Sequence, residues 1–425
     1  KRYGQNTLEQ LLAIYPNEIP ELTINDYPKY AHRGFMIDCS RHFFTVTEIK
    51  KQIAVMALLK LNIFHWHLTD DQGWRIAIKK YPLLTEYGAK RLQTRNDKTE
   101  VGGYYTQDEI KEIVLFCQTR GIDVIPEIDM PGHFTAACSA YPELLCTRQK
   151  VAVAEHFGIL PNIACAGRDF TYQFCYDVLN EVCELFPYAY IHIGGDEALK
   201  INWLTCPDCL AKMQTENLAT PEALETYFLN KMASYLMAKG KKVICWNDGI
   251  SSDKIDRNII MHYWKDNAEF TKQAIKAIAK GQKAIVSPFA NYYLDYNYGI
   301  TPLKKTYDYE HCFLEDNVIG LEAPIWSEYI NTVNKLERLA YPRLIAVAER
   351  AWTNKPDYDS FLTRLDFFNK KLDHLLIAYT PLGEVNPWFL KRLILKLKFY
   401  FYSIDKNIIK SFIKVWQYKK KKRLH

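Results

Sequence analysis

Apolar segments of strand length alternate with stretches of helical periodicity along most of the chain. Eight segments have strand character: 34–40, 63–70, 122–129, 189–197, 242–248, 259–265, 283–289 and 318–328. Between them, apolar residues recur at helical spacing, most clearly at 47–61, 106–120, 170–186, 221–239 and 335–351. The pattern predicts eight strand–helix units.

Strands that are nearly continuously apolar indicate a parallel sheet covered by helices. Eight successive strand–helix units therefore predict an α/β fold, a (β/α)8 TIM barrel, which we assign to residues 31–383. Residues 1–30 precede it with one helical run at 7–14. Residues 384–425 form a basic amphipathic tail that we expect to be helical.

The composition is that of a globular protein. With 425 residues, 48% of them hydrophobic and 24% charged, the chain suits a large core. No apolar stretch is long enough to cross a bilayer. Because residue 1 is Lys rather than Met, we expect a processed or truncated start from which any export signal is already missing.

The net charge of +6 comes from the end of the chain. Residues 384–425 contain twelve Lys and Arg against two acids, so the tail carries +10 and the rest carries −4. A basic tail with interleaved aromatic residues suits a membrane surface or a polyanion, but runs of charge are usually just solvated. We favour a solvated end over membrane contact, and expect no nucleic-acid partner.

Eleven cysteines are scattered through the predicted strands and helices. This odd number indicates buried small side chains rather than a disulfide framework. Cys206 and Cys209 resemble half of a zinc site, but no second pair lies at a suitable spacing. We therefore expect two cysteines in a loop.

Polar and aromatic side chains collect where the predicted strands end, which is where barrel enzymes place their chemistry. They are Asp38, His67 with Asp70, Glu127 with Asp129, Asp196 with Glu197, Trp246 with Asp248, Trp264 with Asp266, and Trp326 with Glu328. Seven such ends predict an acidic and unusually aromatic site.

The adjacent carboxylates Asp196 and Glu197 follow two glycines at the end of one strand. Two carboxyl groups that flank a glycosidic bond are ordinarily about 5–9.5 Å apart, a geometry that sequence neighbours seldom reach. The pair instead suits a division of labour. Glu197, with a raised pKa, protonates the leaving oxygen, while Asp196 stays ionised and stabilises positive charge. A solvated acid pair is the alternative.

Trp246, Trp264 and Trp326 follow three different strands. Flat apolar walls suit a sugar ring or an acetyl methyl group. Each alone is more often a core residue, but their coincidence with strand-end carboxylates reverses that balance and favours a sugar pocket.

His65 and His67 lie on one face of a strand, a spacing that also suits a metal ion. Together with His133, Glu127 and Asp129 they keep a metal-dependent hydrolase open as a rival. That rival leaves the three tryptophans unexplained.

From about Tyr3 to Trp352, the chain resembles the β-N-acetylhexosaminidases of glycoside hydrolase family 20. The segments that carry the resemblance are 32–38 with 40–43, 64–75, 126–133, 196–197, 293–295, 326–328, 341–343 and 349–352. So many ordered matches make the resemblance specific.

The resemblance implies substrate-assisted hydrolysis, an exception to the two-carboxylate scheme. The substrate's 2-acetamido oxygen attacks the anomeric carbon, and water opens the resulting oxazolinium with retention. Glu197 is then the general acid and base, Asp196 orients the acetamido N–H, and Tyr293 donates a hydrogen bond to the acetamido oxygen. Trp246, Trp264 and Trp326 enclose the acetyl group and the ring faces.

Further roles follow from the resemblance by motif position. Arg33, Asp295 and Glu328 are expected to bind the sugar hydroxyls. Asp70, or the acid after it, is expected to pair with His133 and tune the acid. The implied partner is an oligosaccharide or glycoconjugate that ends in an N-acetylhexosamine. No cofactor is implied, and a periplasmic, extracellular or lysosome-like compartment is expected.

The chain departs from the family pattern in two places. Many members carry an extra Trp after the Tyr293 motif, where residues 296–310 offer only tyrosines. Members also usually have a small α/β domain before the barrel, of which residues 1–30 resemble only the last part, or else a linker. A catalytically silent sugar-binding protein is a third reading, and its discriminator, a lost acid or aspartate, is not met because Asp196 and Glu197 are both present.

Overall fold

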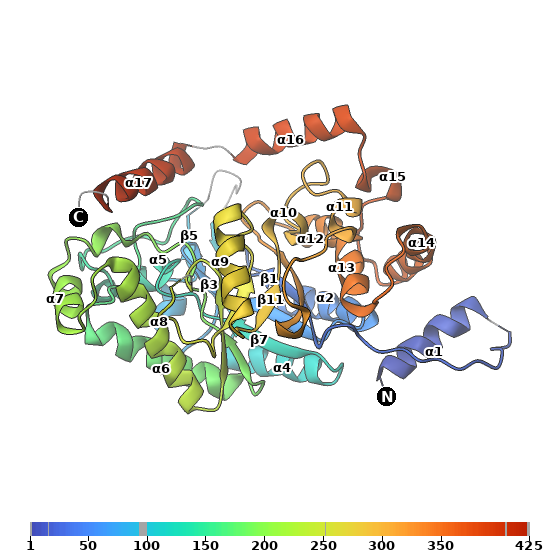
Figure 1. Cartoon of the computed structure of the whole chain (residues 1–425), viewed down its shortest axis with the longest axis horizontal. Helices are drawn as coiled ribbons and strands as arrows, with labels where there is room; N and C mark the ends of the chain where they lie inside the picture. Colours follow the sequence, from blue (N-terminus) through green and yellow to red (C-terminus); the bar gives the residue numbers. More distant parts are fainter. Residues whose placement is uncertain (1, 16, 93–99, 251, 404–405, 423–425) are drawn as a thin grey trace.

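The computed structural model describes residues 2–15, 17–92, 100–250, 252–403 and 406–422. Its centre is a closed barrel of eight parallel strands surrounded by helices (Figure 1). The barrel strands are β1 (His32–Asp38), β2 (Ile63–His67), β7 (Asp123–Glu127), β8 (Tyr190–His192), β9 (Lys242–Trp246), β10 (Ile260–Tyr263), β11 (Ala284–Val286) and β12 (Val318–Ile325). Each lies inside or overlaps one predicted segment, so the predicted (β/α)8 barrel is confirmed.

The strands follow one another around the barrel in chain order, and β12 closes it against β1. Every neighbouring pair is parallel. Two short antiparallel pairs lie outside the barrel in the segment after β2: β3 (Thr69–Asp70) with β4 (Gly73–Trp74), and β5 (Lys90–Arg91) with β6 (Val101–Gly102). All the carboxyl ends of the barrel strands therefore face the same way.

Most of the longer helices of the barrel region begin with a capping side chain. The longer helices are α2 (Val46–Leu58), α4 (Gln107–Gln118), α6 (Asp169–Leu185), α8 (Pro221–Ala238), α9 (Ala268–Ala279), α12 (Val333–Ala340), α13 (Arg343–Trp352) and α14 (Tyr358–His374). Thr45 and Thr106 each form a capping box with a Glu three residues later, which satisfies backbone N–H groups at the helix start.

The helix predicted at 335–351 is divided into α12 and α13. Pro342 has no N–H to continue the helix, and Tyr341 before it adopts the extended backbone that a following proline favours. The single predicted helix was therefore wrong at this point.

The remaining helices are short or lie outside the barrel. They are α1 (Arg2–Ile14), α3 (Leu83–Glu86), α5 (Thr135–Ala140), α7 (Pro207–Thr215), α10 (Phe289–Tyr292), α11 (Leu303–Tyr307), α15 (Leu382–Val385), α16 (Phe389–Ser403) and α17 (Lys406–Lys422). Three 3-10 turns cover Pro142–Leu144, Lys200–Asn202 and Glu315–Asn317.

The basic tail is helical, and its helices α16 and α17 run along one side of the barrel (Figure 1). Phe399 of α16 packs against Tyr296 and Tyr329, and the Tyr418 hydroxyl of α17 donates to Glu222 at the start of α8. Within the described residues, every helix is too short or too polar to span a bilayer.

The barrel interior changes character along the strands. Near the amino ends, five isoleucines pack together: Ile63, Ile125, Ile244, Ile260 and Ile285. Side chains of a strand alternate between its faces, so the next inward positions lie two residues further along. On β2, β7, β9 and β10 these are His65, Glu127, Trp246 and His262, all buried. The interior therefore passes from an apolar layer to a charged and aromatic one that leads to the carboxyl ends.

The isoleucine layer yields a stability prediction. Replacing the fully buried Ile285 by Ala is expected to lower the free energy of unfolding by about 2–5 kcal/mol, because it leaves a cavity where neighbours cannot close in. The matched control is Ile275→Ala on α9, where the side chain is 43% exposed and the change should stay within about 0.5 kcal/mol. Urea denaturation of both variants measures the difference, and equal losses would contradict the layer's role.

Candidate active site

The catalytic pair predicted from the sequence lies on the loop that leaves β8. Gly194 and Gly195 precede it with positive φ, and a Cβ on Gly194 would meet the Asp129 carboxylate at 1.7 Å. Only glycine fits there, so the chain turns sharply and brings the two acids to the barrel mouth. Glu197 itself has φ +48, and its N–H donates to Asp248 at 3.2 Å.

His133 joins this pair to the predicted Asp70. Its Nδ1 lies 3.1 Å from Asp70 and 3.5 Å from Asp71, while its Nε2 lies 3.6 Å from Asp196 and 3.8 Å from Glu197. Burial opposes the imidazolium, but Asp70 and Asp196 outweigh burial and raise the pKa of His133 well above its usual range. His133 is therefore a cation placed between two sets of carboxylates.

Burial is the main reason that both acids of the pair hold protons more tightly than usual. It raises the pKa of Asp196 to about 7, opposed by His133 and reinforced by Asp248 and Glu197. It also raises the pKa of Glu197, again opposed by His133, and opposed next by Lys265. Asp129 lies within 4.8 Å of Asp196, and burial together with Asp196 raises the pKa of Asp129 well above its usual range, so these neighbouring acids retain a proton between them.

One oxygen of Asp196 has no hydrogen-bond partner within the described part of the chain. Its Oδ1 is buried, and none of the described residues donates to it. A buried acceptor without a donor is costly, and ligand-binding sites are where such atoms are found. Asp196 is thus suited to accept an N–H or O–H from a bound molecule.

The predicted aromatic residues meet beside the pair. Trp246, Tyr293 and Trp326 pack in one cluster with Met36, and Trp264 lies against it. The ring centroids of Trp246 and Trp326 are 5.9 Å apart, and Trp264 stacks on Tyr293 at 6.0 Å. Burial raises the pKa of Tyr293 well above its usual range, so its hydroxyl remains a hydrogen-bond donor.

Two of these aromatic residues are held by carboxylates. The Trp246 indole donates to Glu127 at 2.7 Å, and the Trp264 indole donates to Asp248 at 2.9 Å. Because Asp248 also accepts the N–H of Glu197, the loop with the acid and the tryptophan wall share one anchor.

Arg343 holds the backbone of the segment that carries Tyr293 and Asp295. This buried guanidinium donates to the backbone carbonyls of Leu294 at 2.6 Å and Tyr296 at 2.7 Å. The Asp295 Oδ1 is buried and accepts no hydrogen bond from the described residues. Asp295 and its neighbour Glu328, whose pKa burial also raises, are placed to accept hydroxyl groups.

The placement expected for Arg33 is wrong. It lies near the amino end of β1, and its guanidinium donates to the carbonyls of Tyr30 at 2.7 Å and Lys60 at 3.0 Å. It also lies 5.2 Å from the Trp352 ring centroid. Since all strands run in parallel, a residue at the start of β1 is a whole strand away from the carboxyl ends.

Arg41, three residues after β1 ends, takes the position expected of Arg33. Its guanidinium lies 2.8 Å from Asp70, 3.3 Å from Asp38 and 4.8 Å from the Trp326 ring centroid. Burial disfavours this charge, but the carboxylates, first Asp70, outweigh it and raise the pKa of Arg41. Strand direction is the signal that distinguishes Arg41 from Arg33.

The histidines of the metal hypothesis are already paired with carboxylates. His65 lies 2.6 Å from Glu322 and 3.0 Å from Glu127, and His67 lies 2.6 Å from Glu127 and 3.0 Å from Asp70. These partners outweigh burial and raise the pKa of His65 to about 9 and that of His67 well above its usual range. These carboxylate partners account for the buried position of both histidines by charge pairing.

The comparisons with known proteins agree with this geometry. The family model described as glycosyl hydrolase family 20, catalytic domain, matches residues 30–355. A beta-hexosaminidase of Porphyromonas gingivalis is 38% identical over 412 residues, which cover 90% of this chain and 52% of that protein. The chain thus spans about half the length of this curated relative.

Solved structures are similar as well. The β-N-acetylhexosaminidase of Bacteroides fragilis is 34% identical with a TM-score of 0.79, covering 89% of this chain and 79% of that one. The exo-β-N-acetylglucosaminidase of Vibrio harveyi, solved in complex with N-acetylglucosamine, is 31% identical with a TM-score of 0.79, covering 89% and 64% respectively.

The buried charge pairs predict a large asymmetry between two Glu→Gln variants. Glu322→Gln leaves the buried His65 without its closest counter-charge and is expected to lower the free energy of unfolding by about 3–5 kcal/mol. Glu112→Gln removes an exposed partner of Lys50 and should cost at most about 1 kcal/mol. Chemical denaturation compares them, and a Glu322→Gln variant as stable as Glu112→Gln would contradict the charge pairing.

Proposed function

The chain belongs to glycosyl hydrolase family 20, and on that premise we propose that it is an exo-acting, retaining β-N-acetylhexosaminidase. Its substrate is an oligosaccharide or glycoconjugate with a terminal, non-reducing N-acetylglucosamine or N-acetylgalactosamine. The observation that carries the proposal is the unpartnered Oδ1 of Asp196 beside Glu197 and the aromatic cluster. An acetamido group offers the N–H, the carbonyl oxygen and the methyl that these three features suit.

In the first step, the acetamido oxygen of the substrate attacks the anomeric carbon as the glycosidic bond breaks. Glu197 gives its proton to the leaving oxygen. Asp196 accepts the acetamido N–H and stabilises the positive charge of the oxazolinium, while the Tyr293 hydroxyl donates to the acetamido oxygen. In the second step, Glu197 removes a proton from water, which opens the oxazolinium with retention.

Substrate binding itself sorts the proton between the two acids. An N–H that donates to Asp196 favours the ionised form of that carboxylate. Burial meanwhile raises the pKa of Glu197, which favours a proton on that acid, where the first step needs it. A raised pKa on both acids thus serves a site in which only one of them has to stay ionised.

The hydroxyls of the terminal sugar have their own candidates. Asp295 and Glu328 are acceptors at the barrel mouth, and Arg41, rather than Arg33, is the donor among them. Because Arg41 also pairs with Asp70, a hydroxyl bound there is coupled to the charge of His133.

The activity is tested with p-nitrophenyl β-N-acetylglucosaminide, which the full chain is expected to hydrolyse. Glu197→Gln should lower kcat by roughly 10²–10⁴-fold, and the loss should be larger for an alkyl glycoside, because a poor leaving group depends more on proton donation. The exposed Glu143→Gln on the segment after β7 serves as the matched control and should retain full activity.

An N-acetylglucosamine thiazoline, which mimics the cyclised intermediate, should inhibit the wild type competitively and bind more weakly to Asp196→Asn. Hydrolysis without thiazoline binding would indicate a protein nucleophile instead of the acetamido group. Full activity of Glu197→Gln would refute the assigned acid.

The pKa shifts predict a direction for the pH dependence. The Lys265 ammonium lowers the pKa of Glu197, both directly and by pairing with Asp248 at 3.3 Å. In Lys265→Met the pKa of Glu197 rises, so the acid keeps its proton to higher pH and the alkaline limb of kcat/KM moves upward. Lys265→Arg keeps the charge and should leave that limb in place. A limb that stays, or moves to lower pH in Lys265→Met, would contradict the electrostatic role.

A further inference from the structure

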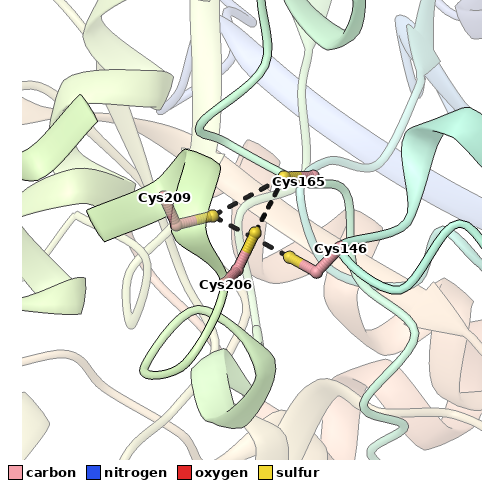
Figure 2. A group of neighbouring side chains, drawn as sticks. All are labelled: Cys146, Cys165, Cys206 and Cys209. Carbon is pink, nitrogen blue, oxygen red and sulfur yellow. Dashed lines mark hydrogen bonds between the residues drawn. The ribbon is translucent and has the colours of Figure 1, made fainter. Parts of the chain in front are cut away.

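Four cysteines from two loops of the barrel gather in one cluster (Figure 2). They are Cys146, Cys165, Cys206 and Cys209. We call them the cysteine cluster, and we propose that its four thiolates bind a structural zinc ion. The sequence reading of two cysteines in a loop was wrong, because the fold brings two partners from 41 and 60 residues upstream of Cys206.

The distances between the sulfurs fit a tetrahedral metal. Sγ of Cys165 lies 3.7 Å from that of Cys206 and 3.6 Å from that of Cys209, and Sγ of Cys146 lies 3.8 Å from that of Cys209. Zn–S bonds of about 2.3 Å in a tetrahedron put neighbouring sulfurs about 3.8 Å apart. A disulfide needs about 2.05 Å, and none of the described cysteines forms one.

The cluster is closed to solvent. Three of its members are buried and Cys146 is half-buried. Structural zinc sites are closed in this way, with four protein ligands and no open position, whereas catalytic zinc keeps one position for water or substrate. The cluster therefore suits a structural metal and not a catalytic one.

The backbone is shaped to bring the sulfurs together. A Cβ on Gly167 would lie 2.2 Å from the carbonyl carbon of Asp208 and 2.3 Å from the N of Cys209. Only glycine allows the Cys165 loop to lie directly on the 206–209 turn. Cys206 is the N-cap of α7, a position where the positive end of the helix dipole favours a thiolate.

Arg168 holds together the backbone segments that surround the cluster. Its guanidinium donates to Asp208 at 2.6 Å and to the carbonyls of Glu143 at 2.6 Å and Cys146 at 3.0 Å. These hydrogen bonds link the backbone around Cys146 to the start of α7. Four thiolates and Zn²⁺ carry a net charge of −2, which a neighbouring guanidinium partly offsets.

The cluster connects the segment that carries His133 to the segment that carries Asp196 and Glu197. Cys146 and Cys165 lie on the segment after β7, which also carries His133, while Cys206 and Cys209 follow the β8 loop with Asp196. Ala164, next to Cys165, donates from its N–H to the Pro131 carbonyl at 2.9 Å. The zinc would thus act as a positioning element for His133 and not as part of the reaction.

The test begins with the metal content of the full chain, purified without an affinity metal and without chelator. Elemental analysis is expected to give about one zinc ion per chain, released when a mercurial reagent titrates the thiols. The double variant Cys206→Ser/Cys209→Ser should lose that zinc. Cys183→Ser, half-buried like Cys146 but outside the cluster, should retain it.

A second measurement holds even where the double variant fails to fold. Wild-type chain produced with cobalt in place of zinc should show the charge-transfer and d–d bands of a tetrahedral tetrathiolate site. Removal of the metal should also speed tryptic cleavage at the exposed Arg148 and Lys150 at least several-fold, since it releases their loop.

Two outcomes would overturn the proposal. One is a folded chain that contains no zinc and no cobalt after growth with either metal, and whose four thiols react freely. The other is peptide mapping that finds disulfides linking Cys146 with Cys209 and Cys165 with Cys206. Neither outcome depends on the glycosidase activity, so this test and that of the proposed function fail separately.

Discussion

A line of alternating carboxylates and histidines inside the barrel is the interaction on which the site depends. It runs from Glu322 through His65, Glu127, His67, Asp70 and His133 to the pair Asp196 and Glu197. Neighbouring members lie 2.6 to 3.8 Å apart. Burial opposes each charge, but the opposite partners keep the histidines protonated and lower the pKa of Glu322, Glu127 and Asp70. Each of these charges would be strongly destabilising in the dry interior without its partners. The members of the line therefore depend on one another for stability.

The line also explains the behaviour of the catalytic pair. Asp196 and Glu197 lie at its end, where His133 is the only histidine of the line within 4 Å and both acids compete for it. Burial then wins over the remaining attraction, and both pKa values rise instead of falling. Charge pairing thus fixes the protonation of the residues in the barrel centre, whereas burial leaves a transferable proton on the acids at the barrel mouth.

Sequence reasoning found what depends on local pattern and missed what depends on direction and distance. The eight strands were marked by apolar segments of strand length, and Asp196 and Glu197 by two glycines at a strand end. Arg33 was misplaced because its motif was matched without regard to strand direction: it is the second residue of β1, whereas Arg41 follows the carboxyl end of that strand. The cysteine cluster was missed for another reason. Its two pairs of cysteines lie on segments that are far apart in the sequence, and the contact of these segments at Gly167 cannot be predicted from residue spacing.

The two loops around the pair are held by different chemistry at each end. Near the barrel mouth, His133 and Asp196 attract each other across 3.6 Å. This attraction changes whenever the pair gains or loses its proton, as it does in the proposed reaction. At the far end, Arg168 joins the same two segments by hydrogen bonds, and the zinc that we propose for the cysteine cluster would add links that no proton at the pair affects. A site that must alter its own charge benefits from a fixed point that does not, because His133 can then stay in place while its partners titrate.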